Sequence, residues 1–183
     1  MITNQTLKLF PEPVFKYKFD NPKELNTELS KYIYDLRDKD AEGLKRSNKG
    51  GWHSQNFKLT EKDSIQFKFA VKIQPYIVNA FQNFGWKIKD KNIRISEMWA
   101  IINKKDDFNV IHTHPNCFLS AAYYVKASKD CGKFEVEHPN SAKKYAFPEI
   151  EKRNELNLEV ASIEIEEGDL LLFPSYLPHK VSQ

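Results

Sequence analysis

His112-Thr113-His114-Pro115-Asn116 is the stretch of this chain that decides its fold and its chemistry. In an extended strand, side chains alternate between faces, so two histidines separated by one residue place both imidazoles on the same face. A third histidine, His179, follows far downstream, after several short apolar runs. An HxH pair on one strand with a distant histidine on another is how an all-β barrel builds a three-ligand metal site with open positions. The alternative is that His112 and His114 are polar residues of a loop before a strand.

The region around this stretch has the pattern of short strands. From Asn92 onwards, apolar and polar residues alternate, and turn residues interrupt the alternation. The predicted strands cover residues 93–103, 108–111, 118–126, 133–137, 158–165 and 170–173. Strands of this length and spacing indicate an antiparallel sandwich or barrel. Residues 139–157 show no clear period, and we interpret them as a long loop over the barrel mouth.

The N-terminal half combines one strand with helices. Residues 14–19 alternate apolar and basic side chains and predict a strand. Asn21-Pro22 predicts a helix start, with Asn21 as N-cap and Pro22 in the first helical position. The predicted apolar face of this helix consists of Leu25, Leu29, Tyr32, Ile33 and Leu36.

A second helical pattern runs from Thr60 to about Phe84. Pro75 lies inside it, which predicts a kink or two abutting helices, and Gly85 predicts its end. We expect one structural domain, mostly β with N-terminal helices, in which residues 1–91 supply a strand and bracing helices and residues 92–183 form the core.

Composition excludes several classes of protein. The 183 residues include 28 basic and 25 acidic side chains in mixed order, giving a net charge of +3 and no clustered nucleic-acid footprint. Cys117 and Cys131 lack CxxC spacing, which argues against a disulfide scaffold and favours a reducing interior. No signal peptide and no run long enough for a membrane span is present, so we expect a cytoplasmic protein. The sequence is silent on oligomeric state.

Four motifs together resemble one family, the 2-oxoglutarate/Fe(II)-dependent oxygenases. They are residues 112–116, Tyr123-Tyr124-Val125, Gly132-Lys133-Phe134, and the segment from Gly168-Asp169-Leu170 to His179-Lys180-Val181. More narrowly, they resemble bacterial and phage oxygenases in which an HxHP motif precedes a strand of the pattern SGvyYv. The Gly-Gly-Trp of residues 47–54 and Met98-Trp99 also fit. The resemblance covers about residues 45–183.

The resemblance implies a double-stranded β-helix, the jelly-roll core also found in cupins. It implies Fe(II) held by His112, by the residue at position 114 and by the distal His179. It implies that Tyr124 points inward and hydrogen-bonds the distal carboxylate of 2-oxoglutarate, while Tyr123 packs on the opposite side. No catalytic residue beyond the metal ligands is assigned.

Position 114 departs from the family pattern, which places a carboxylate there. Three neutral imidazoles would leave Fe(II) with its full +2 charge, whereas a carboxylate would neutralise part of it. Either His114 binds the metal in a three-histidine site, which we favour, or it lies behind the ligands and water fills the position.

A second departure concerns the arginine that usually binds the co-substrate about nine residues after the distal histidine. The sequence stops at Gln183, before that position, which we interpret as truncation or as a disordered tail left out of this sequence. Lys126, Lys133 and Arg153 are candidate replacements, with none preferred.

The resemblance implies a dioxygenase that hydroxylates an unknown substrate, with oxidative decarboxylation of 2-oxoglutarate to succinate and CO2. Two alternatives remain: a three-histidine zinc enzyme, and a cupin-like binding module with a vestigial site. Candidates for an apolar lining, each equally compatible with plain core, are Trp99, Phe118, Phe134, Phe173 and Tyr176.

The two remaining histidines are not expected to bind the metal. His53 is interpreted as a hydrogen-bonded loop residue. His138 is interpreted as a solvent-exposed turn residue, with an approach to the substrate side as the alternative.

Overall fold

Leu170-Leu171-Leu172-Phe173 forms most of β9, the strand on which both hydrophobic cores of the molecule are built. The structure is a computed structural model that describes residues 5–88, 93–145 and 148–183. In the N-terminal half the elements are β1 (Phe15–Lys18), α1 (Lys23–Lys39), β2 (Asn48–Lys49), β3 (Trp52–His53) and α2 (Ile65–Asn83). In the C-terminal half they are β4 (Ile101–Ile102), β5 (Phe108–His112), β6 (Leu119–Tyr123), β7 (Phe134–Glu137), the 3-10 helix η1 (Ser141–Lys144), β8 (Val160–Ile163), β9 (Asp169–Pro174) and β10 (His179–Val181).

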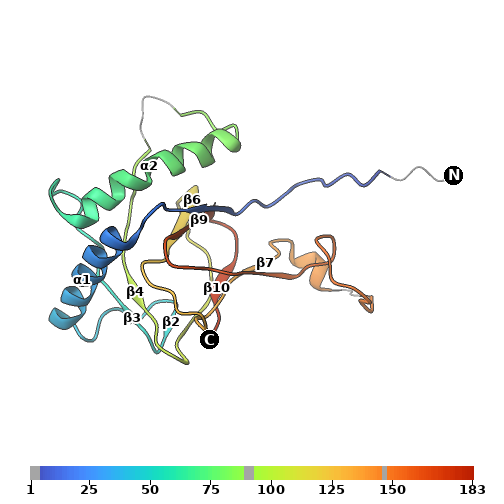
Figure 1. The fold of residues 1–183 in the computed structure, drawn as a ribbon. Coiled ribbons are helices and arrows are strands. Elements are labelled where there is room, and N and C mark those ends of the chain that lie inside the picture. The colour runs from blue at the N-terminus through green and yellow to red at the C-terminus, as the bar shows by residue number, and fades with distance from the viewer. Residues whose placement is uncertain (1–4, 89–92, 146–147) are drawn as a thin grey trace.

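The described strands form two main antiparallel sheets and one short two-stranded sheet whose strands are far apart in the sequence. One sheet has the order β1-β9-β6, the other has the order β2-β5-β10-β7-β8, and β3 pairs with β4. Figure 1 shows α1 and α2 together on one side of these sheets. Two antiparallel sheets with helices at one side correspond to the predicted jelly-roll with N-terminal helices, so the predicted fold class is confirmed.

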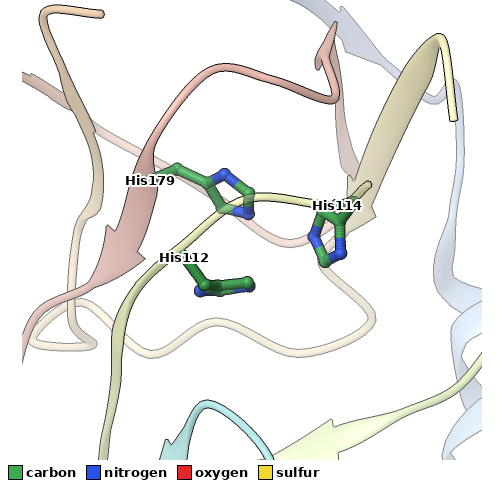
Figure 2. A group of neighbouring side chains, drawn as sticks. All are labelled: His112, His114 and His179. Atoms are coloured by element: carbon green, nitrogen blue, oxygen red, sulfur yellow. The ribbon is translucent and has the colours of Figure 1, made fainter. Parts of the chain in front are cut away.

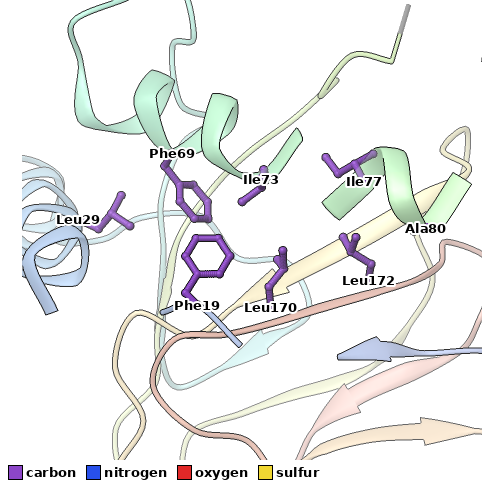
Figure 3. Close-up of a cluster of buried hydrophobic side chains, with 8 residues drawn as sticks. All are labelled: Phe19, Leu29, Phe69, Ile73, Ile77, Ala80, Leu170 and Leu172. Atoms are coloured by element: carbon purple, nitrogen blue, oxygen red, sulfur yellow. The ribbon is translucent and has the colours of Figure 1, made fainter. Parts of the chain in front are cut away.

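The first core lies between the β1-β9-β6 sheet and the two helices (Figure 3). Leu170 and Leu172 project from β9 towards side chains of both helices. The full buried set is Phe19, Leu29, Phe69, Ile73, Ile77, Ala80, Leu170 and Leu172.

The second core lies between the two sheets. Leu171 and Phe173 alternate with Leu170 and Leu172 along β9, so they point to the opposite face. There they pack with Phe134, Val136 and Leu177. A strand covered on both faces has no polar side, which explains the uninterrupted apolar run in its sequence.

Both helices occur where the sequence predicts them, but their ends differ. α1 begins at Lys23 with Pro22 as the N-cap and without a side-chain cap, so the predicted cap by Asn21 is wrong. Asn21 instead has φ +46°, a left-handed conformation that turns the chain between β1 and α1. α2 begins at Ile65, because the Ser64 hydroxyl accepts a hydrogen bond from the backbone N–H of Phe67.

The C-terminal half of α2 bears on two other predictions. α2 is one helix with Pro75 inside, so the alternative of two abutting helices is wrong. Gly85 has φ +66° and follows the helix, as predicted for its end.

The long strand predicted over residues 93–103 is largely wrong. β4 covers only Ile101 and Ile102 of this segment. The backbone N–H groups of Ser54 and Phe57 donate to the carbonyls of Ala100 and Met98. The segment is therefore held by an irregular loop rather than by a regular sheet ladder.

The β7–β8 connection contains η1 and is otherwise without regular structure over its described residues. Figure 1 shows it beyond β7, on the side opposite to the helices. A long connection is found as predicted, and its role at the barrel mouth stays a prediction. The predicted division after residue 91 falls within residues 89–92, outside the described residues. Among the described helices, none combines the length and apolarity that a membrane span needs.

Candidate metal centre

Three histidine rings converge at one end of the space between the sheets (Figure 2). His112 is the last residue of β5 and His179 the first of β10, and the two are directly paired across the antiparallel ladder. The ring centroids of this pair are 4.4 Å apart. The ring centroid of His114 lies 4.9 Å from that of His112 and 5.0 Å from that of His179. One potential ligand atom from each residue lies within 4.8 Å of the others.

His114 reaches the cluster by a different route from the one predicted. β5 ends at His112, so the HxH pair does not share one regular strand. The backbone N–H of His114 instead donates to the carbonyl of Ser175, at 2.9 Å. Ser175 lies just after β9, and its hydroxyl is 2.8 Å from that of Ser120 on β6. The segment carrying His114 is therefore attached to the β1-β9-β6 sheet, whereas β5 belongs to the other sheet.

Backbone carbonyls orient two of the three rings. Nδ1 of His112 is 2.8 Å from the carbonyl oxygen of Val110, and Nδ1 of His179 is 2.9 Å from that of Leu177. A carbonyl only accepts, so a neutral ring in this position carries its proton on Nδ1 and leaves the Nε2 lone pair free. This arrangement fixes the tautomer and the orientation that a metal-binding imidazole needs.

Burial favours the neutral form of the His114 and His179 rings. The pKa of His179 is lowered to about 4, mainly because burial disfavours the charged ring, with a smaller contribution from the positive charges of His112 and His114. The hydrogen bond to Leu177 acts in the opposite direction but is outweighed. Burial and the charge of His112 also lower the pKa of His114, against an opposing effect of Glu97. Neutral rings keep the lone pairs that bind metal.

The donor set fits a divalent transition metal. Imidazole nitrogen suits iron, zinc, copper and nickel, whereas magnesium and calcium prefer oxygen. The candidate metal-binding cluster found among the described residues contains three histidines and no carboxylate. A metal held by it would keep its full charge and have positions open for further ligands.

The surroundings of the cluster are partly aromatic. The ring of His179 lies 5.5 Å from that of Phe134 and 4.6 Å from that of Phe173, and all three side chains are buried. These two phenylalanines belong to the second core and adjoin His179, so their role as an apolar lining stays a prediction. Phe118 and Tyr176 are 75% and 59% exposed, so they do not belong to a buried lining.

Trp99 contacts His114 of the cluster and also His53, a histidine that was not predicted to lie near this site. The ring centroids of Trp99 and His114 are 5.7 Å apart. His53 stacks on Trp99 at 5.6 Å with an interplanar angle of 15°. His53 is buried and its Nδ1 lies 2.7 Å from the carbonyl oxygen of Ser54, which confirms a hydrogen-bonded residue, although in β3 rather than in a loop. Burial lowers its pKa.

His138 lies outside the three-histidine cluster. Its Nδ1 accepts a hydrogen bond from the backbone N–H of Asn140 at 3.0 Å, which is the geometry of a turn. The side chain is half-buried rather than fully exposed as predicted.

The adjacent tyrosines face opposite cores, as predicted. Tyr123 packs in the first core, and its hydroxyl donates to Oδ1 of Asn26 at 2.7 Å. Tyr124 packs in the second core, where burial raises the pKa of its phenol and keeps it protonated. Tyr124 therefore shares the space between the sheets with the residues that surround His179.

The candidate partners for a co-substrate carboxylate lie on the surface. Lys126, Lys133 and Arg153 are all exposed, and the Nζ of Lys133 is 2.6 Å from Oε1 of Glu164. The structure therefore gives none of them a place in the core that contains Tyr124.

Comparison with known proteins gives a family match for the C-terminal part of the chain. Residues 97–183, which include all three histidines, match the family described as "Putative 2OG-Fe(II) oxygenase". The matched region is 87 of the 183 residues, and over it the chain is similar to that family of Fe(II)- and 2-oxoglutarate-dependent enzymes. A search of curated protein sequences gives no match.

Two solved structures show the same fold. A prolyl-4-hydroxylase from Pseudomonas putida aligns with a TM-score of 0.63 and 14% identity, over 93% of this chain and 84% of that one. A prolyl hydroxylase from Trichoplax adhaerens, solved with a peptide of hypoxia inducible factor, aligns with a TM-score of 0.60 and 13% identity, over 92% and 76%.

Proposed function

We propose that the protein is an Fe(II)- and 2-oxoglutarate-dependent dioxygenase that hydroxylates a C–H bond of a substrate still to be identified and releases succinate and CO2. The observation that carries the proposal is the convergence of His112, His114 and His179 within a chain region that matches this family. When bound, the iron and 2-oxoglutarate supply the oxidation chemistry, and the protein supplies binding, orientation and exclusion of water.

All three histidines are proposed as ligands. The carbonyls of Val110 and Leu177 support this role for His112 and His179, because they leave Nε2 of each ring free towards the centre. His114 is included because its ring lies within 5.0 Å of both others, centroid to centroid. Ligation by His114 gives a site with no protein carboxylate, so binding of the dianionic 2-oxoglutarate would provide the neutralising charge.

Tyr124 is the proposed partner of the distal carboxylate of 2-oxoglutarate. Its phenol stays protonated because burial raises its pKa, so it can donate a hydrogen bond to an anion. Its place among the side chains between the sheets supports this role.

A three-histidine zinc enzyme is the second candidate, and the observation that supports it is that the described cluster contains no carboxylate. Zinc accepts three imidazoles and uses an open position for a water whose pKa it lowers to about 7. The first test is therefore metal analysis after anaerobic purification. Iron in near-stoichiometric amount supports the oxygenase, and zinc that excludes iron supports the rival.

The decisive test adds 2-oxoglutarate to the Fe(II)-loaded protein without oxygen and records the visible metal-to-ligand charge-transfer band. Succinate is then measured after air is admitted, with a panel of substrates that includes proline-containing peptides because two proteins of the same fold are prolyl hydroxylases. We expect a band and succinate above the iron-free control. A protein that binds iron but gives neither would be assigned to the vestigial binding modules.

Tyr124→Phe separates the co-substrate site from the metal site. It removes the hydroxyl and keeps the ring, so we expect unchanged iron binding and about a tenfold weaker response of the band to 2-oxoglutarate, the loss expected when one hydrogen bond to a charged group is removed. Tyr123→Phe is the matched control, because this hydroxyl faces the other core.

A further inference from the structure

One histidine of the proposed site is oriented differently from the other two. His112 and His179 each place Nδ1 against a carbonyl two residues earlier in the chain. The ring of His114 instead has an aromatic neighbour, Trp99, at 5.7 Å and 51°. Because an imidazole ring can rotate about its side-chain bonds, a ligand without a hydrogen-bonded orientation needs packing to hold it.

Trp99 is itself held in place from behind. His53 stacks on it nearly parallel, at 5.6 Å and 15°. His53 is only 6% exposed, and the contact of its Nδ1 with the carbonyl of Ser54 at 2.7 Å orients the ring. The rings of His53, Trp99 and His114 are therefore successive neighbours from β3 to the candidate metal centre, with the first pair stacked and the second pair tilted.

The backbone around the stack joins its two sides. The N–H of Ser54 donates to the carbonyl of Ala100 at 2.9 Å, and the N–H of Ala100 donates to the hydroxyl of Ser54 at 2.9 Å. His53 and Trp99 precede these two residues, so the reciprocal pair fixes the distance between their backbones. Ser54 is 1% exposed and Ala100 is 8% exposed, which shields both hydrogen bonds from water.

We infer that Trp99, supported by His53, is the positioning residue that holds the ring of His114 in its ligating orientation. The inference rests on the proposed function, since it assumes that His114 is a ligand. It adds that the irregular segment before β4 and the β3 strand are parts of the metal centre, although neither contributes a ligand. His53 acts as a flat, buried support and not as a fourth ligand.

The test uses Co(II), whose visible d–d bands report ligand number and geometry, and needs no turnover. The variants are Trp99→Ala, which removes the ring, Trp99→Leu, which fills space without a flat face, and Trp99→Phe, which keeps one. We expect Trp99→Ala and Trp99→Leu to bind Co(II) about 10- to 100-fold more weakly, the usual cost of losing support behind a ligand. Their bands should shift towards those of His114→Ala, whereas Trp99→Phe should resemble the wild type.

The control is Trp86→Ala. Trp86 also stacks on an aromatic ring, that of Phe84 at 4.3 Å and 11°, but outside the histidine cluster. It should lose stability without changing the Co(II) spectrum. The His53 pair completes the design: His53→Phe keeps the stack and should bind Co(II) as the wild type does, and His53→Ala should bind it more weakly.

The outcomes separate the inference from the proposed function. If the wild type and all variants fail to bind any transition metal, the proposed function fails. If the wild type binds Co(II) and folded Trp99→Leu has the same affinity and spectrum, His114 needs no support from Trp99 and the inference is wrong. Loss of Co(II) binding in His53→Phe would also overturn it, because a side chain that only stacks would be replaceable by phenylalanine.

Discussion

Leu172 and Phe173 are neighbours on β9, each 1% exposed, and they face different cores. Truncating either to alanine should destabilise the fold. Replacing a buried leucine with alanine lowers the free energy of unfolding by about 2–5 kcal/mol, and replacing a buried phenylalanine lowers it by about 3–5 kcal/mol. For a domain of this size each kcal/mol lowers the melting temperature by roughly 2–4 °C. Leu172→Ala should therefore melt about 4–20 °C lower and Phe173→Ala about 6–20 °C lower.

Metal binding should distinguish the two variants. The ring of Phe173 packs at 4.6 Å against His179, while Leu172 contacts the helices on the other face of the strand. Without the Phe173 ring, the imidazole of His179 keeps its hydrogen-bond partner, the carbonyl of Leu177, but loses the aromatic ring that packs against it. We expect about a tenfold weaker Co(II) affinity for Phe173→Ala, at the lower end of the effect of losing support behind a ligand, and an unchanged affinity for Leu172→Ala.

The assay is thermal unfolding of both metal-free proteins by circular dichroism, followed by Co(II) titration at a temperature where both are folded. Equal losses of Co(II) affinity in the two variants would refute the reasoning. They would show that metal binding follows global stability and not the packing around His179.

Three further predictions concern the stability of the metal-free protein in urea. Asp169→Asn should destabilise it at neutral pH, because the buried carboxylate accepts 2.7–3.2 Å contacts from both lysines of β1 and the N–H of Glu166. Burial alone would raise the pKa of Asp169, but these contacts lower it. The difference in the free energy of unfolding between wild type and Asp169→Asn should therefore be full above about pH 4, the ordinary carboxyl pKa, and vanish as the pH falls through the lowered pKa of Asp169. A difference that grows at acidic pH would contradict this. Tyr123→Phe should cost about 1–3 kcal/mol, since Oδ1 of buried Asn26 loses its donor, and a neutral result would argue against that bond. Gly168→Ala should cost more than about 1 kcal/mol, because Gly168 has φ +84° and a Cβ would lie 2.8 Å from Cγ of Pro22; an increase in stability would contradict it.

The elements that the sequence predicts well are those whose burial leaves a period in the chain. β9 reads as a continuous apolar run because both faces are covered, and the helical spacing of α1 and α2 reflects one buried side each. His112, His114 and His179 could be selected from the sequence by the HxH spacing and the distal histidine, and the structure places them together.

The parts that were predicted wrongly depend on contacts between distant residues. The alternation in residues 93–103 is that of a strand, but its backbone pairs with Ser54 and Phe57, which lie in an irregular loop. The same contacts bring Trp99 and His53 to the metal centre, and no local pattern encodes them. Asn21 was a good N-cap by residue type, yet the turn from β1 placed it in a left-handed conformation.

The central claim is that His112, His114 and His179 together hold one iron ion. Equilibrium binding of Fe(II) under anaerobic conditions tests it most directly, with His179→Ala compared against His138→Ala, a histidine outside the cluster. We predict one iron per chain for the wild type and His138→Ala, and loss of tight binding for His179→Ala. Equal iron retention by both variants would contradict the assignment.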